Sequence, residues 1–177
     1  KISKKTGSNF AIKSGDRNPL HIDKIYAHNS MFGENICHGV LVFLHFLRLN
    51  KLLIDNNLLN INIKFLNPVY YEKKIHIKKI NKYNYILFQK KIIVLKISIN
   101  CKDSILNLKN IYLKKILKLK QINFFFKNNK KIKTIETLLM HLSAYSGMFY
   151  PGKNCLINEI SINKINNKSD LNKIKIY

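Results

Sequence analysis

The chain has 177 residues, of which 46% are apolar, and a formal net charge of +23. That length and composition predict a globular protein with one ordinary core or two small ones. The charge alone would favour nucleic acid as the partner, but only Arg17 and Arg48 are Arg, and the many Lys residues are spread among Ile and Asn. Because Arg is the better bidentate ligand for phosphate, we attribute the excess of Lys to compositional drift and predict no specific nucleic-acid binding.

Membrane and disulfide-rich proteins are also disfavoured by the sequence. The most apolar run, 40–49, is interrupted by polar residues and is much shorter than the roughly 20 residues of a membrane helix, so we interpret it as a buried helix. No secretory signal is visible. Cys37, Cys101 and Cys155 lie far apart without a CxxC pair, which indicates neither a disulfide framework nor a zinc site. We therefore expect a cytoplasmic protein without membrane association.

The first part of the chain predicts short helices and then one buried helix. Asn18 and Pro19 are an N-cap residue and the residue pre-set for a first helical turn, so one or two short helices are expected between 18 and 32. His38 and Gly39 precede the apolar run, which is hydrophobic nearly all round. This pattern predicts a central helix that other structure encloses.

The pattern then changes to short runs rich in β-branched residues, which predict antiparallel strands. The expected strands are Leu59–Phe65, Lys74–Ile80, Tyr83–Lys90 and Ile92–Asn100. Residues 106–133 are rich in Lys and fit both helical and strand periods. We expect part strand and part linker in that region.

A second helix is expected at 134–148, followed by a strand at 155–165 and a loose C-terminal end. The helix should begin at Thr134 as its cap and end near Gly147. Its predicted apolar face consists of Ile135, Leu138, Leu139, Leu142 and Tyr145.

A carboxylate and an imidazole flank the start of the first short helix. Asp16 and His21 have ordinary pKa values of about 3.9 and 6.5, and such a pair can share one water, one partner taking a proton while the other orients or donates one. Pro19 restricts the backbone between them, so both side chains can be held toward one point. The alternative is a plain turn in which Asn18 caps a helix.

The N-terminus of the helix that begins at Gly39 is a second candidate feature. Its free N–H groups and the positive end of its dipole can polarise a carbonyl, and glycine allows a ligand to approach closely. His38 is expected to be a packed or capping residue. The remaining histidines lack metal-ligand spacing with a supporting carboxylate, so we predict surface or satisfied core positions and no metal for His28, His45, His76 and His141.

The segment from Phe10 to Leu41 resembles the hydratase motif of the MaoC family, in which an FAxxSGDxNPxHxD run is followed by FGxxIxHGxL. The matching positions are Phe10, Ala11, Ser14, Gly15, Asp16, Asn18, Pro19, His21, Asp23, Phe32, Gly33, Ile36, His38, Gly39 and Leu41. So many residues at fixed spacings make this resemblance far more specific than an isolated Asp/His pair.

The resemblance implies an α+β hot-dog fold, an antiparallel sheet wrapped around a long central helix that begins near His38. The family includes (R)-specific enoyl-CoA hydratases and 3-hydroxyacyl dehydratases, which add water to a 2-enoyl thioester or remove it from the product. By this resemblance Asp16 and His21 activate the water, and the N–H of Gly39 holds the thioester oxygen. The residues expected to bind substrate or support the loop are Ser14, Asn18, Pro19 and His38.

Two features of the chain depart from the family pattern. Many (R)-hydratases carry a Ser eight residues beyond the glycine of the His-Gly pair, close to the catalytic histidine, whereas this chain has Leu47 there. The acyl pocket is therefore expected to differ. The strand that usually precedes the motif is largely absent, because only residues 1–9 stand before Phe10.

Residues 138–162 resemble, more loosely, the central helix and following strand of a second hot-dog repeat, without an Asp/His motif. We therefore predict a double hot-dog with an incomplete second repeat. The expected parts are a MaoC-like domain with the hydratase motif at 1–110, a connecting segment at 111–133 and a partial second repeat at 134–177. The alternative is a single hot-dog with a C-terminal extension that pairs as a homodimer.

The predicted function is hydration of 2-enoyl thioesters or dehydration of 3-hydroxyacyl thioesters, without a cofactor. The thioester carrier is coenzyme A or acyl carrier protein, and the positive charge of the chain would attract either one, because the first is phosphorylated and the second acidic. The alternatives are a hot-dog thioesterase or a thioester-binding protein, and, less favoured, a basic nucleic-acid-binding module.

Overall fold

The computed structural model describes residues 1–50, 60–100, 122–126, 130–149, 156–165 and 171–176. The chain divides into two compact units. The first, called the helical unit below, comprises Lys1–Asn50, Pro68–Lys74 and Lys118–Leu156; the second, the sheet unit, comprises Lys51–Asn67, Ile75–Leu117 and Ile157–Tyr177. Helices and an antiparallel sheet are both present, which confirms the predicted α+β class.

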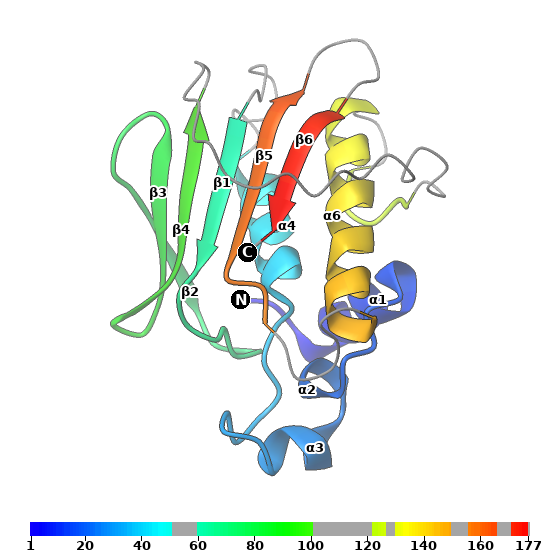
Figure 1. Ribbon diagram of the computed structural model, residues 1–177. Coiled ribbons are helices and arrows are strands. Elements are labelled where there is room, and N and C mark those ends of the chain that lie inside the picture. The colour runs from blue at the N-terminus through cyan, green and yellow to red at the C-terminus, as the bar shows by residue number, and fades with distance from the viewer. Residues whose placement is uncertain (51–59, 101–121, 127–129, 150–155, 166–170, 177) are drawn as a thin grey trace. The chain divides into compact units, whose positions relative to one another are not determined.

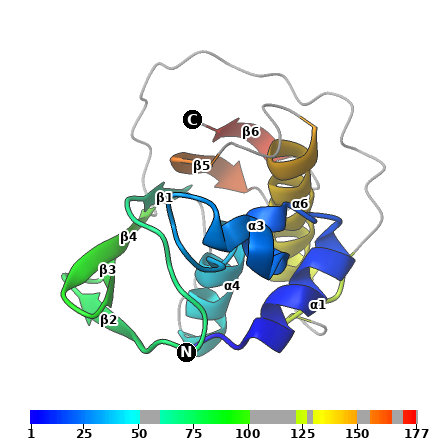
Figure 2. The ribbon, with the colours of Figure 1, turned by 90° about the horizontal axis from the view of Figure 1, so that it is seen from below.

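The described helices all lie in the helical unit. They are α1 (Lys4–Ser14), α2 (Pro19–Ile22), α3 (Lys24–His28), α4 (Gly39–Leu49) and α6 (Lys130–Met148). Helix α6 contacts both α1 and α4, and Figure 2 shows the three together. Every predicted site residue also belongs to this unit, so the site forms within one compact body.

Helix α1 is an element that the sequence did not lead us to predict. Ser3 is its N-cap, and the Ser3 hydroxyl accepts a hydrogen bond from the N–H of Thr6. Gly15 ends the helix with a φ of 84°, a left-handed conformation that glycine adopts without strain, and donates its N–H to the carbonyl of Ala11. Asp16 therefore follows directly after the end of the helix, and that sharp end depends on glycine.

The two short helices between residues 18 and 32 are present as predicted. Asn18 caps α2, and Pro19 is the first residue of that helix, where its missing N–H costs nothing. Asp23 ends α2 and caps α3, because its carboxylate accepts hydrogen bonds from the N–H groups of Ile25 and Tyr26.

Helix α4 agrees with the buried helix predicted from the apolar run. Its buried residues are Val40, Leu41, Val42, Phe43, Leu44, Phe46 and Leu47. Helix α6 begins at Lys130, four residues before the predicted Thr134, and ends at Met148, next to the predicted Gly147. Four of the five residues predicted on its apolar face are buried, but Tyr145 is 54% exposed, so that part of the prediction was wrong. Its ring stacks with Phe149 instead.

The sheet unit contains one antiparallel sheet, shown in Figure 1. The strand order is β2-β3-β4-β1-β5-β6. The strands are β1 (Asn60–Phe65), β2 (Ile75–Lys79), β3 (Asn84–Gln89), β4 (Ile92–Asn100), β5 (Glu159–Ile165) and β6 (Leu171–Ile176). The first four lie within one residue of the predicted bounds at each end, and β5 begins later than the predicted strand.

Buried isoleucines occupy matching positions in three adjacent strands, β4, β1 and β5. Ile61 of β1 pairs with Ile99 of β4 and Ile162 of β5, and the next inward residue, Ile63, pairs with Ile97 and Ile160. All six are buried. Because side chains alternate between the faces of a strand, this register gathers them on one apolar face of the sheet.

The C-terminal end departs from the prediction. We expected the last residues to be loose, but 171–176 form strand β6, which pairs with β5. The strand predicted within 106–133 lies mostly outside the described residues, and 122–126 form no helix or strand. The proposed domain boundaries stay a prediction. No helix of the described part of the chain is long and apolar enough to cross a membrane.

Candidate active site

The loop after α1 is fixed from within by Ser14. Its hydroxyl donates to the carbonyl of Phe10 at 2.7 Å and accepts a hydrogen bond from the N–H of Asp16 at 3.1 Å. Ser14 and Asp16 are both buried. Since one hydroxyl ties the last turn of the helix to the main chain of Asp16, the loop has little freedom at this point.

Asn18 and Pro19 hold the other side of the same loop. The amide oxygen of Asn18 accepts a hydrogen bond from the N–H of Leu20 at 3.1 Å, which caps α2. The N–H of Asn18 donates to Oδ1 of Asp16 at 3.3 Å. Asn18 therefore both starts the helix that carries His21 and steadies the Asp16 carboxylate, as expected for a loop-supporting residue.

The Asp16 carboxylate lies in a buried site, where the residue is only 3% exposed. Its second oxygen, Oδ2, accepts a hydrogen bond from the hydroxyl of Ser143 on α6 at 2.6 Å. Burial raises the pKa of Asp16 above its ordinary 3.8, against the opposing effects of His21, Ser143 and Asn18. A carboxylate with a raised pKa is a stronger base than an exposed one.

His21 enters the site from α2 with a defined tautomer. Its Nδ1 lies 2.9 Å from the carbonyl oxygen of Ile36, and because a carbonyl only accepts, Nδ1 carries the hydrogen. The Nε2 atom of the neutral ring is therefore the one with a free lone pair. Burial lowers the pKa of His21 below its ordinary 6.5, although Asp16 acts in the opposite direction. The neutral, proton-accepting form is favoured.

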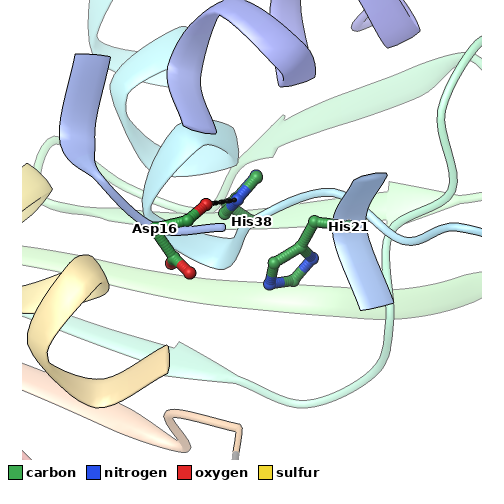
Figure 3. A group of neighbouring side chains, drawn as sticks. All are labelled: Asp16, His21 and His38. Carbon is green, nitrogen blue, oxygen red and sulfur yellow. Dashed lines mark hydrogen bonds between the residues drawn. The ribbon is translucent and has the colours of Figure 1, made fainter. Parts of the chain in front are cut away.

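His38 is held by hydrogen bonds at both ring nitrogens. Its Nε2 lies 3.1 Å from the main-chain carbonyl oxygen of Asp16, so it donates there, as the dashed line in Figure 3 shows. Its Nδ1 then accepts from the hydroxyl of Tyr71 at 3.5 Å. Burial and the neighbouring His21 lower its pKa well below 6.5. His38 is thus a packed, neutral residue at the N-cap of α4, as predicted.

The structure brings the predicted pair together. Side-chain ligand atoms of Asp16, His21 and His38 all lie within 4.8 Å of one another. The rings of His21 and His38 lie in contact, with centroids 3.8 Å apart and planes tilted by 34°. Two groups that hydrogen-bond the same water lie about 4.5 Å apart, so atoms of Asp16 and His21 that are at most 4.8 Å apart are within reach of one shared water.

Gly39 opens α4 beside this cluster. His38, the N-cap, makes no side-chain hydrogen bond to the first turn, and Gly39 itself is partly exposed. The first N–H groups of a helix have no intrahelical partner and carry the positive end of its dipole. The N–H of Gly39 is therefore suited to hold a carbonyl oxygen that gains negative charge.

The cluster of Asp16, His21 and His38 has the residue types of a metal site, a possibility that the sequence did not suggest. The hydrogen bonds oppose it. His38 donates from Nε2 and accepts at Nδ1, so neither nitrogen has a free lone pair for a metal. Only Asp16 and His21 remain as ligands, fewer than the three protein ligands of an ordinary catalytic zinc site.

Two residues of the site were not predicted as such from the sequence. Ser143 lies 127 residues from Asp16 along the chain, and only the fold places it there. Tyr71 donates a hydrogen bond to His38 and packs against α1. Leu47 is fully buried in α4. Of the isolated histidines, His28 and His76 are exposed and His45 lies beside Arg48 and Phe125.

Comparisons with known proteins agree with the sequence motif. The family model described as a MaoC-like domain matches residues 1–99. No match is found among curated proteins. Solved structures with some likeness include an (R)-hydratase from A. caviae, at 19% identity and a TM-score of 0.42 over 56% of this chain and 89% of that one.

Two further structures show a similar degree of likeness. An R-hydratase from Pseudomonas aeruginosa is 24% identical over 63% of this chain and 85% of that one, with a TM-score of 0.42. A monoamine oxidase regulatory protein from an Archaeoglobus species is 23% identical over 54% and 78%, with a TM-score of 0.43. These likenesses are too weak to carry an argument. The match over residues 1–99 spans more than half of the chain, which therefore belongs to the MaoC-like domain family, with its α+β hot-dog fold.

Proposed function

We propose that this protein hydrates 2-enoyl thioesters, or dehydrates 3-hydroxyacyl thioesters, with Asp16 and His21 as the groups that activate water. The observation that carries the proposal is the convergence of a buried carboxylate and a histidine of fixed tautomer at water-sharing distance. Hydrogen bonds fix both groups and still leave Nε2 of His21 and a second lone pair on each Asp16 oxygen for a water.

In the hydration direction, Nε2 of His21 accepts a proton from the water while the water oxygen forms a bond to C3 of the enoyl group. The Asp16 carboxylate accepts a hydrogen bond from the other water hydrogen, which stays on the new hydroxyl group, and stabilises the positive charge on His21. The C2–C3 double-bond electrons move toward the thioester, whose oxygen is held by the N–H of Gly39. The proton on His21 then passes to C2, which completes the addition of one water.

The proposed substrate is carried by coenzyme A or by acyl carrier protein, and the proposed reaction uses no metal or other cofactor. The net charge of +23 favours a phosphorylated or acidic carrier electrostatically. Pairing of two hot-dog units, within one chain or between two copies, remains the proposed assembly.

Loss of absorbance of a conjugated enoyl thioester tests the proposal. Wild type is expected to remove the absorbance, and Asp16→Asn or His21→Ala should lose about 100-fold or more in rate, because each variant removes one half of the acid-base pair. Unchanged rates in both variants would contradict the assignment.

Matched controls come from the same segment. Asp23→Asn makes the same chemical change at an exposed carboxylate, and Asn is an equally good cap for α3. His28→Ala removes an exposed histidine close by. Both are expected to keep the wild-type rate, which would attribute the losses at Asp16 and His21 to their position and not to the type of substitution.

A further inference from the structure

Helix α6 lies beyond the residues that match the family model, yet it touches the proposed water-activating carboxylate. Ser143 donates its hydroxyl to Oδ2 of Asp16 at 2.6 Å, and Ser143 is only 4% exposed. The two oxygens of Asp16 are thus bonded from different directions, since Oδ1 accepts from Asn18 in its own loop. Hydrogen bonds to an ionised carboxylate are shorter and stronger than neutral ones.

Gly147, one turn further along α6, shows how closely the helix approaches. A Cβ built on Gly147 would lie 3.0 Å from the carboxyl carbon of Asp16, and closer still to Oδ1. A side chain of any kind would therefore displace the carboxylate. The φ of Gly147 is not in the left-handed region, so close approach, and not backbone conformation, is what requires glycine at this position.

We propose that α6 completes the active site. Ser143 is a positioning residue that orients and holds the ionised Asp16 carboxylate, and the missing side chain of Gly147 leaves room for that carboxylate. This inference rests on the proposed function, because it gives Ser143 a role in the same hydration step. It also makes the C-terminal part of the chain necessary for activity, although the hydratase motif lies entirely in the N-terminal part.

Kinetics of Ser143→Ala test the first half of the proposal. Loss of one hydrogen bond to a buried carboxylate should lower kcat about 10-fold or more, and leave KM close to wild type because Ser143 orients Asp16 and does not bind the substrate. Ser146→Ala is the matched control, because Ser146 is also a buried serine of α6. Ser146→Ala should keep the wild-type kcat. Equal kcat values in Ser143→Ala and wild type would overturn the proposal.

Gly147→Ala tests the close approach separately. Ala is the better helix former, so α6 itself should gain stability, but the added methyl group would push the carboxylate away and lower kcat about 10-fold or more. A fully active Gly147→Ala variant would contradict the close approach. Circular dichroism and urea unfolding of Gly147→Ala separate the two causes, because a folded variant with low kcat would have lost activity through the displaced carboxylate.

A titration that needs no activity separates this inference from the proposed function. With carboxyl-labelled Asp, the carbon-13 resonance of Asp16 is identified by its absence in Asp16→Asn. Its pKa should rise by about one unit or more in Ser143→Ala and stay unchanged in Ser146→Ala. A shift in a protein without hydratase activity would refute the proposed function and support the contact. An unshifted pKa would overturn the positioning role, whatever the activity.

Discussion

At the scale of single residues, the two neighbouring histidines of the site have different hydrogen-bond partners. His38 has both ring nitrogens engaged, one with the carbonyl of Asp16 and the other with Tyr71. His21 uses only Nδ1, on the carbonyl of Ile36, and its Nε2 is the atom left to exchange a proton. Protonation of His38 would cost its hydrogen bond from Tyr71, so His21 is the one of the two that we propose as the proton carrier.

The protonation states of the pair predict the acid side of the pH profile. Burial raises the pKa of Asp16 from 3.8 and lowers that of His21 from 6.5, and the proposed reaction needs an ionised Asp16 and a neutral His21. Activity should therefore fall as pH is lowered, with an acid limb centred above pH 3.8, because the buried Asp16 gains its proton above that value.

The measurement is kcat/KM for enoyl thioester hydration as a function of pH, with circular dichroism at each pH to show that the protein stays folded. An acid limb centred at or below pH 3.8 would contradict a buried Asp16 carboxylate as part of the reacting pair. It would indicate an exposed or ion-paired carboxylate instead.

At the scale of elements, the contact between α1 and the segment that carries Tyr71 predicts an unusual effect of Gly7→Ala. A Cβ on Gly7 would lie 2.6 Å from Cε1 of the buried Tyr71, and closer still to its hydroxyl. Ala normally stabilises a helix interior relative to Gly by about 0.5–1 kcal/mol. Here the clash should outweigh that gain and destabilise the protein by about 1–3 kcal/mol.

Urea unfolding of Gly7→Ala and of Ser8→Ala measures this effect. Ser8 is the exposed neighbour of Gly7 in α1, so Ser8→Ala should leave the free energy of unfolding equal or slightly higher. If Gly7→Ala were more stable than wild type, that result would contradict the close packing of Tyr71 against α1. The same variant would also displace Tyr71 from His38.

The elements also show which parts of the fold local sequence could predict. Alternating β-branched residues located β1 to β4 closely, and the Asn18–Pro19 cap located α2, because these signals act over a few neighbouring residues. Helix α1 has no comparable apolar period and contains Gly7, so its caps were the only local signal. Strand β6, LNKIKI, is short and rich in polar residues, so its local sequence did not identify it. It is identified by its pairing with β5.

At the scale of the whole molecule, the candidate site combines a local motif with a distant helix. The motif predicted Asp16, His21 and their supporting residues, since all lie within one short segment. Ser143 could not be predicted, because helical periodicity indicates which face of α6 is buried but not which residue that face contacts. The sequence thus indicated which residues of the motif to consider, while the packing of α6 against Asp16 became visible only in the folded chain.

The fate of the water oxygen tests the central claim most directly. The protein is incubated with a 2-enoyl-CoA in water labelled with oxygen-18, and the products are analysed by mass spectrometry. Addition at C3 predicts one labelled oxygen in the hydroxyl group of an intact 3-hydroxyacyl thioester. Label in the carboxylate of a free acid, together with released thiol, would instead indicate thioester hydrolysis and would contradict Asp16 and His21 as a hydratase pair.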